Sequence, residues 1–511
     1  MSGNDGIERS KKTGTTVVES GHEQTSSGLL IPRRALLQGA SAAVAAATIL
    51  KNVRPTAAAT TGPVKMGFIE DYSGNLAVYG LQKLHAAQLA VKEINEGKTL
   101  KGSPAIGTGG MSVMAQYAGK APTIGRTGTD LPVVDDGGAK DGMSTAFVED
   151  PEILIDSGDK GILGRELQLI SPDGQSNNAI WQQLARKLIQ EDKIDVLVAG
   201  FASAEREAIR PIVDQFKQLY FYTNQYEGGV ADAYTFCTGP VCEQQVIPGV
   251  QYMVEKFGPR GYTIAADYNF GQLTAAWTRA FAPLVGGKII GEEFIPLSVS
   301  EFSTVIAHIQ EAKPDWVMTL LVGQNHHNYY PQAAAAGLKL PMVSTVNMAQ
   351  GYEHRRFAPP SLANMHNAIQ YQLEVPTPRN RAFVKRWMAM FPDDQYIGEM
   401  AQNTYFTIHL YAKAARLAGT TDQETVRQAL HLGWSIEAPE GAVFLEPATH
   451  HCAHYIRLAT TNENQDVIFV REWPMIQAWW LQRLGVNLIR HPEFKQYVPD
   501  EDPYFTMFLK K

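Results

Sequence analysis

The chain has few cysteines, no strong net charge and no long apolar run, and each absence excludes a class of protein or of partner. Three cysteines among 511 residues are too few for a disulfide-built scaffold. A net charge of -7 gives no general attraction to nucleic acid or anionic lipid, so neither is an expected partner. No apolar run reaches the roughly 18 to 20 residues that span a bilayer, which predicts a mature protein without a transmembrane segment.

Motifs of the common enzyme and metal-binding classes are also missing. The sequence has no GxSxG elbow, P-loop, HExxH or paired CxxC arrangement in a supporting context. His450, His451 and His454 lack a carboxylate or thiolate partner at convincing spacing beyond Cys452, so we interpret them as structural or adventitious. We therefore expect no catalytic residue, no metal and no cofactor.

The first 59 residues are typical of an export signal. Arg33 and Arg34 precede the mildly apolar run GASAAVAAATIL, and small residues at 57–59 follow. This pattern predicts a twin-arginine signal peptide over 1–59 and a periplasmic protein; a disordered tail with a chance arginine pair is the alternative. In an oxidising compartment Cys237 and Cys242 are close enough in sequence to form a disulfide, and buried free thiols are the other possibility.

The body of the chain alternates short β-branched runs with helical patterns. IDVLVA, from Ile194, is followed by a helix that Ser203 can cap and then by the second apolar run LYFYT. This is a βαβ unit, and ligands gather beyond the carboxyl ends of parallel strands, where helices begin. A second α/β series begins beyond Gln244, so the class is α/β with parallel sheets covered on both faces.

Several segments resemble the type I periplasmic-binding-protein family, and within it the urea and short-chain amide receptors of ABC transporters. They occur in the same order as in the family. The segments are SAEREAIRP, YFYTNQYEG, DYNF, EEFIPL, KPDWVMT and APEGAVFLEPATHH, and the resemblance runs from about Val64 to about Val470. It implies two doubly wound parallel-sheet lobes joined by a three-strand hinge, with a ligand cleft between them. The expected first lobe is 60–243 with 371–440, and the second is 244–370 with 441–470.

Two segments depart from the resemblance. Residues 97–160 form a long insertion rich in Gly, Asp, Ser and Thr, which is either a lid or a surface loop. Residues 471–511 form a C-terminal extension whose tryptophans we expect to pack onto the body, with a partner-docking patch as the alternative.

The resemblance and the strand ends together place the predicted ligand site. Ser203, Tyr222 and the DYxF aromatics match positions at which the family contacts its ligand. The alternatives without a ligand are that Ser203 only caps its helix and that the DYxF aromatics are buried core residues. The remaining candidates are polar or glycine residues at strand ends. The full predicted ligand-binding set is Ser203, Tyr222, Asn224, Tyr268, Phe270, Gly323, Gln324 and Asn347.

The ligand class follows from an absence in the second lobe. Neither strand-end segment, VGQNHHNYY nor STVNMAQG, contains the acid that a buried ammonium would require. We therefore expect a receptor that delivers a small neutral amide, urea or related compound to ABC permease subunits. An amide-responsive sensor of the same fold and a receptor for branched-chain amino acids are the alternatives.

Overall fold

The computed structural model describes residues 61–105, 125–126, 132–133, 140–141, 151–492, 495–503 and 505. The predicted signal peptide and most of the insertion lie outside these residues. Within the described residues, no helix combines the length and the apolar character needed to cross a membrane.

The first lobe is built on a parallel sheet. Its strands lie in the order β8 (Leu167–Ile170), β1 (Val64–Ile69), β9 (Val196–Ala199), β10 (Tyr220–Tyr222) and β12 (Thr235–Cys237). Every residue of β9 is buried, as expected for a strand covered on both faces. The covering helices include α2 (Ala77–Asn95), α4 (Asn178–Lys187), α5 (Ser203–Phe216) and α12 (Glu399–Ala418).

The second lobe repeats this arrangement. Its parallel strands lie in the order β14 (Lys288–Ile295), β13 (Arg260–Ala266), β15 (Trp316–Leu320), β16 (Met342–Ser344) and β17 (Met365–Ile369). Two apolar clusters lie under the helices α6 (Cys242–Phe257), α7 (Asn269–Phe281), α8 (Ser303–Ala312) and α9 (Gln324–Ala335). The expected class, two doubly wound parallel-sheet lobes, is confirmed.

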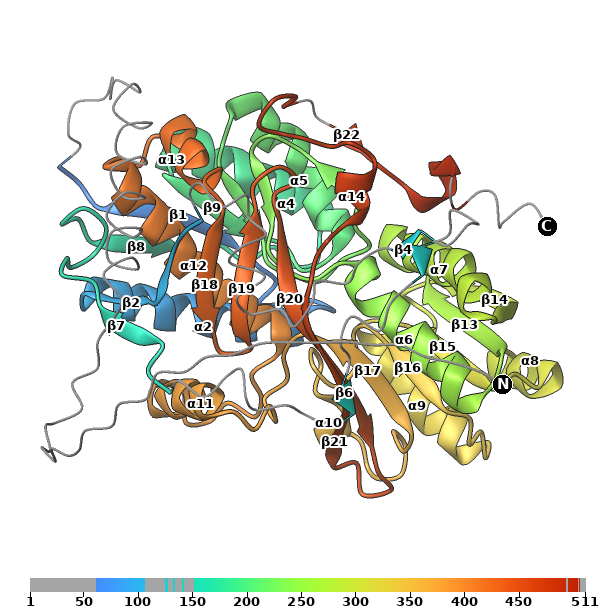
Figure 1. Cartoon of the computed structure of the whole chain (residues 1–511). Helices are drawn as coiled ribbons and strands as arrows, with labels where there is room; N and C mark the ends of the chain where they lie inside the picture. Colours follow the sequence, from blue (N-terminus) through green and yellow to red (C-terminus); the bar gives the residue numbers. More distant parts are fainter. Residues whose placement is uncertain are drawn as a thin grey trace, which may run out of the picture. The chain divides into compact units, whose positions relative to one another are not determined.

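Three connections join the lobes, and one of them is a continuous strand. β20 (His451–Thr461) pairs with β12 at its start and runs antiparallel to β17 at its end, so it belongs to both sheets. Figure 1 shows it between the two groups of strands. The chain also crosses after β12 and after β17.

The last crossing lies later than the sequence pattern places it. APEGAVFLE forms part of the hairpin β18 (Trp434–Ala438) and β19 (Gly441–Glu446), and Val443 and Leu445 of β19 fill the first-lobe core. An alternating strand pattern states which side chains are buried but not which of two cores they fill. The division of the chain into domains stays a prediction in its details.

The C-terminal extension packs onto the body, as expected. β21 (Val467–Ile476) pairs with β20, and β22 (Lys495–Gln496) pairs with β11 (Val230–Ala231) of the first lobe. Trp473 and Trp480 are buried, and the Trp480 ring lies 4.9 Å from that of Trp277 in α7.

The insertion begins and ends at one place. β2 (Lys98–Leu100) pairs antiparallel with β7 (Leu154–Asp156), and β3 (Gly102–Pro104) pairs with β18. The remaining elements are β4 (Gly125–Arg126), β5 (Pro132–Val133), β6 (Lys140–Asp141), η2 (Leu188–Asp192), η3 (Ala282–Val285), α10 (Glu353–Arg356), α11 (Pro378–Met390), α13 (Gln423–Leu430), α14 (Trp480–Arg483) and η4 (Pro499–Glu501).

Candidate functional site

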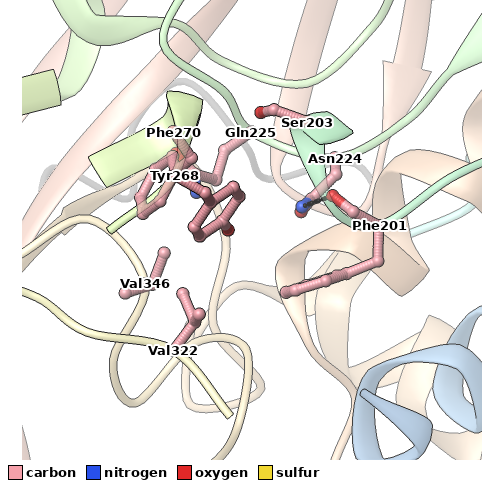
Figure 2. Close-up of a pocket in the computed structure, with 8 residues that line it drawn as sticks. All are labelled: Phe201, Ser203, Asn224, Gln225, Tyr268, Phe270, Val322 and Val346. Carbon is pink, nitrogen blue, oxygen red and sulfur yellow. Dashed lines mark hydrogen bonds between the residues drawn. The ribbon is translucent and has the colours of Figure 1, made fainter. Parts of the chain in front are cut away.

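A small cavity lies between the lobes, at the carboxyl ends of their strands. The space between its lining atoms measures about 190 Å³, part of which is open to solvent. Figure 2 shows the side chains that line it: Phe201, Ser203, Asn224, Gln225, Tyr268, Phe270, Val322 and Val346. All eight come from loops or helix starts that follow a strand, the position where α/β sheets bind ligands.

The turn between β9 and α5 places Phe201 and Ser203 at the cavity. α5 begins at Ser203, but the serine does not cap it: the Glu205 carboxylate accepts hydrogen bonds from the backbone N–H groups of Phe201 (2.9 Å) and Ala202 (2.7 Å). The capping expectation for Ser203 is therefore wrong, because the helix starts one residue earlier: Ala202 is at the N-cap position and Ser203 is the first helical residue. The serine hydroxyl is left for other partners.

Those partners are a buried ion pair behind the cavity wall. Ser203 Oγ donates to Glu227 Oε2 at 2.5 Å, and Arg206 Nη2 donates to Glu227 Oε1 at 2.7 Å. The Arg206 guanidinium also lies 4.9 Å and 4.3 Å from the ring centres of Tyr222 and Tyr226. Ser203, Arg206 and Glu227 are each at most 2 % exposed. Glu227 therefore does not reach the cavity itself, and Ser203 lies between its carboxylate and the ligand.

The loop after β10 supplies two amides. Asn224 Nδ2 donates to the Phe201 carbonyl at 2.7 Å, while its Oδ1 accepts from Gln350 Nε2 at 3.0 Å, so its orientation is fixed from both ends. The side-chain amide of Gln225 makes no hydrogen bond to any residue in the described part of the chain and faces the cavity (Figure 2). A side chain at Gly239, in the crossing after β12, would overlap the backbone of Asn224.

The second lobe contributes aromatic and apolar side chains. Tyr268 and Phe270 lie where β13 passes into α7, with ring centres 5.9 Å apart, and Val322 and Val346 follow β15 and β16. Burial raises the pKa of the Tyr268 phenol well above its ordinary value, so the hydroxyl keeps its proton at neutral pH. This side of the cavity is suited to a flat or apolar ligand surface.

Contacts between the lobes close the cavity. The Gly323 N–H of the second lobe donates to the Tyr79 hydroxyl of α2 at 3.2 Å, and the Tyr79 ring is held within the first lobe by stacking on Phe201 at 3.9 Å. Gln82 of α2 donates to the Gln350 carbonyl at 3.1 Å. Together with the bond between Gln350 and Asn224, these contacts define a closed arrangement of the two lobes around the site.

Glu399, at the start of α12, lies behind these contacts. Its carboxylate accepts from Gln350 (2.6 Å), Gln370 (2.7 Å) and Asn403 (2.7 Å). Gln350 belongs to the second lobe, Gln370 to the crossing after β17 and Asn403 to α12. Burial raises its pKa to about 7, against the opposing effect of these donors. Glu399 therefore titrates near neutral pH at the junction of the lobes.

The predicted site residues divide into two groups. Ser203, Asn224, Tyr268 and Phe270 line the cavity, and Gly323 is next to the lining residue Val322. The other three lie elsewhere: Tyr222 donates its hydroxyl to the Phe201 carbonyl at 2.6 Å, Gln324 is exposed, and Asn347 is buried with its amide on the Tyr330 hydroxyl. Their roles in ligand binding stay predictions.

Four lining residues were not predicted as ligand contacts. Phe201, Gln225, Val322 and Val346 each stand one or two positions from a predicted residue, within the same strand-end segments. The rule that strand ends carry the site could have included them. Glu399 and Gln350, which lie far away in sequence, carry no recognisable signal.

The histidines of the last hairpin and the cysteines lie buried within the body. His451 pairs with the Tyr226 hydroxyl at 2.5 Å and His454 with Glu440 at 2.9 Å, and the described residues include no cluster of three or more ligands suited to a metal ion. Cys237 and Cys242 are free, buried thiols, and burial raises the pKa of Cys237 to about 11.

Two lobes of parallel sheet, three crossings and a cavity between the lobes define a two-lobed solute-binding protein. Residues 63–466 match the periplasmic binding protein family, and the chain belongs to this family.

Solved structures share the fold at low sequence identity. A solute binding protein of an ABC transporter from Rhodopseudomonas palustris BisB5, in complex with 3,4-dihydroxybenzoic acid, is 18% identical with a TM-score of 0.61, over 81% of this chain and 98% of that one. An amino acid ABC transporter substrate-binding protein from Pseudomonas fluorescens Pf-5 is 18% identical with a TM-score of 0.62, over 84% and 100%. A branched-chain amino acid transporter substrate binding protein from Streptococcus pneumoniae, in complex with isoleucine, is 16% identical with a TM-score of 0.60, over 80% and 99%.

Proposed function

We propose that this chain is the extracytoplasmic receptor of an ABC transporter and that it binds a small, neutral amide, urea or related compound between its lobes. Binding and closure, rather than catalysis, are then the functional events. The receptor would present the closed, loaded form to permease subunits.

One observation carries the ligand class: the hydrogen-bonding groups of the cavity are uncharged. The Ser203 hydroxyl and the Asn224 and Gln225 amides offer donors and acceptors, and the described lining residues include no acid or base. An ion in such a cavity would lose its hydration without gaining a counter-charge, which is costly. A planar amide or urea would instead pair with these groups and lie against Tyr268 and Phe270.

A receptor for branched-chain amino acids is the second candidate, because Val322, Val346 and Phe270 offer an apolar surface. Its ammonium group would require a carboxylate. The carboxylate next to the cavity, that of Glu227, is already engaged by Arg206 at 2.7 Å. This favours the neutral ligand. An amide-responsive sensor would use the same site and differs only in its partner.

A ligand screen tests the proposal. Thermal-shift measurements with ureas, amides, amino acids and aromatic acids should find stabilisation by amides or ureas, followed by calorimetry on the strongest ligands. A ligand of about four heavy atoms gains at most roughly -6 kcal/mol, or a Kd on the order of tens of micromolar. A Kd below about one micromolar would indicate a larger ligand. Stabilisation by amino acids alone would overturn the proposed class.

Export and closure have tests of their own. Replacing Arg33 and Arg34 by lysine should keep the protein in the cytoplasm if residues 1–59 are a twin-arginine signal, and unchanged accumulation outside would refute it.

Small-angle scattering should show a smaller radius of gyration with ligand than without it.

A further inference from the structure

We propose that Glu227 determines ligand specificity by fixing the Ser203 hydroxyl as a hydrogen-bond acceptor toward the cavity, so that the site selects N–H donors and rejects carboxylates. This inference rests on the proposed amide-binding function and deepens it. Glu227 does not line the cavity; it acts through Ser203.

The direction of the Ser203 hydrogen bond follows from the ion pair behind it. The Glu227 carboxylate pairs with the Arg206 guanidinium at 2.7 Å and is therefore ionised, and an ionised carboxylate only accepts. At 2.5 Å from this carboxylate, Ser203 Oγ must place its single hydrogen on Glu227 Oε2. The hydroxyl then has only lone pairs to offer the ligand.

Arg206 cannot take the place of a donor in the cavity. Its Nε donates to Glu207 at 2.9 Å, its Nη2 to Glu227, and its Nη1 to Ser203 Oγ at 3.4 Å, which leaves the hydroxyl one lone pair for the ligand. The guanidinium is 0 % exposed. A ligand carboxylate at Ser203 would meet oxygen lone pairs and no hydrogen to accept. An amide NH₂ group at the same place would donate to Oγ.

Glu227→Gln should invert this arrangement. Arg206 Nη2 needs an acceptor, so the glutamine oxygen takes the place of Oε1 and its NH₂ group faces Ser203. Ser203 Oγ then accepts from that NH₂ group, and its hydrogen turns to the cavity. The hydroxyl becomes a donor, as a carboxylate ligand requires.

The test compares matched ligand pairs, benzamide with benzoate and propionamide with propionate, by calorimetry at pH 7.5. The unaltered protein should bind each amide at least about tenfold more tightly than its acid. E227Q should lower this ratio by at least about tenfold, and in an S203A background it should change the ratio by less than about twofold. Equal effects with and without the serine hydroxyl would mean that charge acts through space, which would overturn the proposal.

Glu207→Gln is the matched control, because Glu207 also pairs with Arg206 but does not contact Ser203. It removes the same charge and should change the ratio by less than about twofold; an effect as large as that of E227Q would also overturn the proposal. Should E227Q fail to fold, S203A alone decides: it should lower the ratio of amide to acid affinity by at least about tenfold, and an unaltered ratio would overturn the proposal.

The unaltered protein distinguishes this inference from the proposed function. Acids that bind as tightly as amides would overturn the role of Glu227 and leave a small-ligand receptor standing. Binding of neither member of either pair would overturn the amide class and this inference together.

Discussion

The two lobes contribute different chemistry to one cavity. The first lobe supplies the Ser203 hydroxyl and the Asn224 and Gln225 amides, backed by the buried ion pair of Arg206 and Glu227. The second supplies Tyr268, Phe270 and two valines, and its one polar group among these is a phenol. Hydrogen bonds fix the orientation of a ligand and apolar contact supplies area, so we infer that the first lobe selects the ligand and the second covers it.

Buried charged groups also lie beneath the strand ends of the first lobe. Lys83 pairs with Glu70 beneath the first-lobe strand ends and donates to the Gly200 carbonyl at 2.6 Å. Burial raises the pKa of Glu205 well above its ordinary value, and nearby Asp71 adds to the increase. Such networks hold the β9–α5 turn in one conformation, which keeps Ser203 in place before a ligand arrives.

The largest effect on affinity is expected from Asn224→Ala. This change removes an amide from the cavity, takes away one of the two donors to the Phe201 carbonyl and breaks the bond to Gln350 of the second lobe. A lost bond to the ligand and a lost bond between the lobes cost about 1 to 1.5 kcal/mol each, so we expect a loss of about 2 to 3 kcal/mol in binding, or roughly 30- to 150-fold in Kd by calorimetry.

Asn325→Ala is its control in the second lobe. Asn325 is also fully buried and donates to a backbone carbonyl, that of Val299 at 2.9 Å, but does not line the cavity. It should lower the free energy of unfolding and leave Kd within about twofold. Equal losses of affinity in the two variants would contradict the division of roles.

A smaller effect is expected from Tyr268→Ala in the covering lobe. The change removes one aromatic wall, worth about 1.5 kcal/mol or roughly tenfold in Kd. Phe294→Ala, at a side chain of the same lobe that is 38% exposed, removes an aromatic ring away from the cavity and should leave the affinity unaltered. A loss for Tyr268→Ala that exceeds the loss for Asn224→Ala would reverse the proposed order of the two lobes.

The junction of the lobes should respond to pH through Glu399. Its pKa of about 7 in the folded state exceeds the ordinary 4.5, so the folded protein keeps the proton longer than the unfolded chain. Its contribution to stability therefore falls as the pH rises from about 4.5 to about 7. Glu399→Gln resembles the protonated form, and should gain stability relative to the unaltered protein by about 2 to 3 kcal/mol between pH 5 and pH 8.

Urea denaturation of both proteins at the two pH values measures this difference. The comparison between variants is needed because buried histidines oppose the trend: burial lowers the pKa of His366 and His451 to about 4, which adds stability as the pH rises. Glu301→Gln, at an exposed glutamate, should show no relative change. A constant difference between E399Q and the unaltered protein would refute the titration of Glu399.

Local pattern predicted the fold but only part of the site. Strand runs such as IDVLVA and the helices between them are strong signals, and the ends of those strands contained every lining residue. Within these segments the sequence did not show which side chains turn inward: Gln225 lines the cavity, while Tyr222 donates to a backbone carbonyl instead. That choice depends on packing against distant residues such as Gln350, and no local pattern encodes it.

The smallest change in affinity is predicted at Gln324, another residue whose side-chain direction the sequence does not show. This residue begins α9 of the second lobe directly after Gly323, whose N–H donates to Tyr79, and its own side chain is exposed. If the second lobe only covers the ligand, Gln324→Ala should change Kd by less than about 0.5 kcal/mol in calorimetry, as surface substitutions usually do. Val322→Ala, two residues earlier in the chain and lining the cavity, should weaken binding more than Gln324→Ala does, because it removes apolar contact area. A larger loss at Gln324 than at Val322 would mean that a polar group of the second lobe reaches the ligand, and that selection is shared between the lobes.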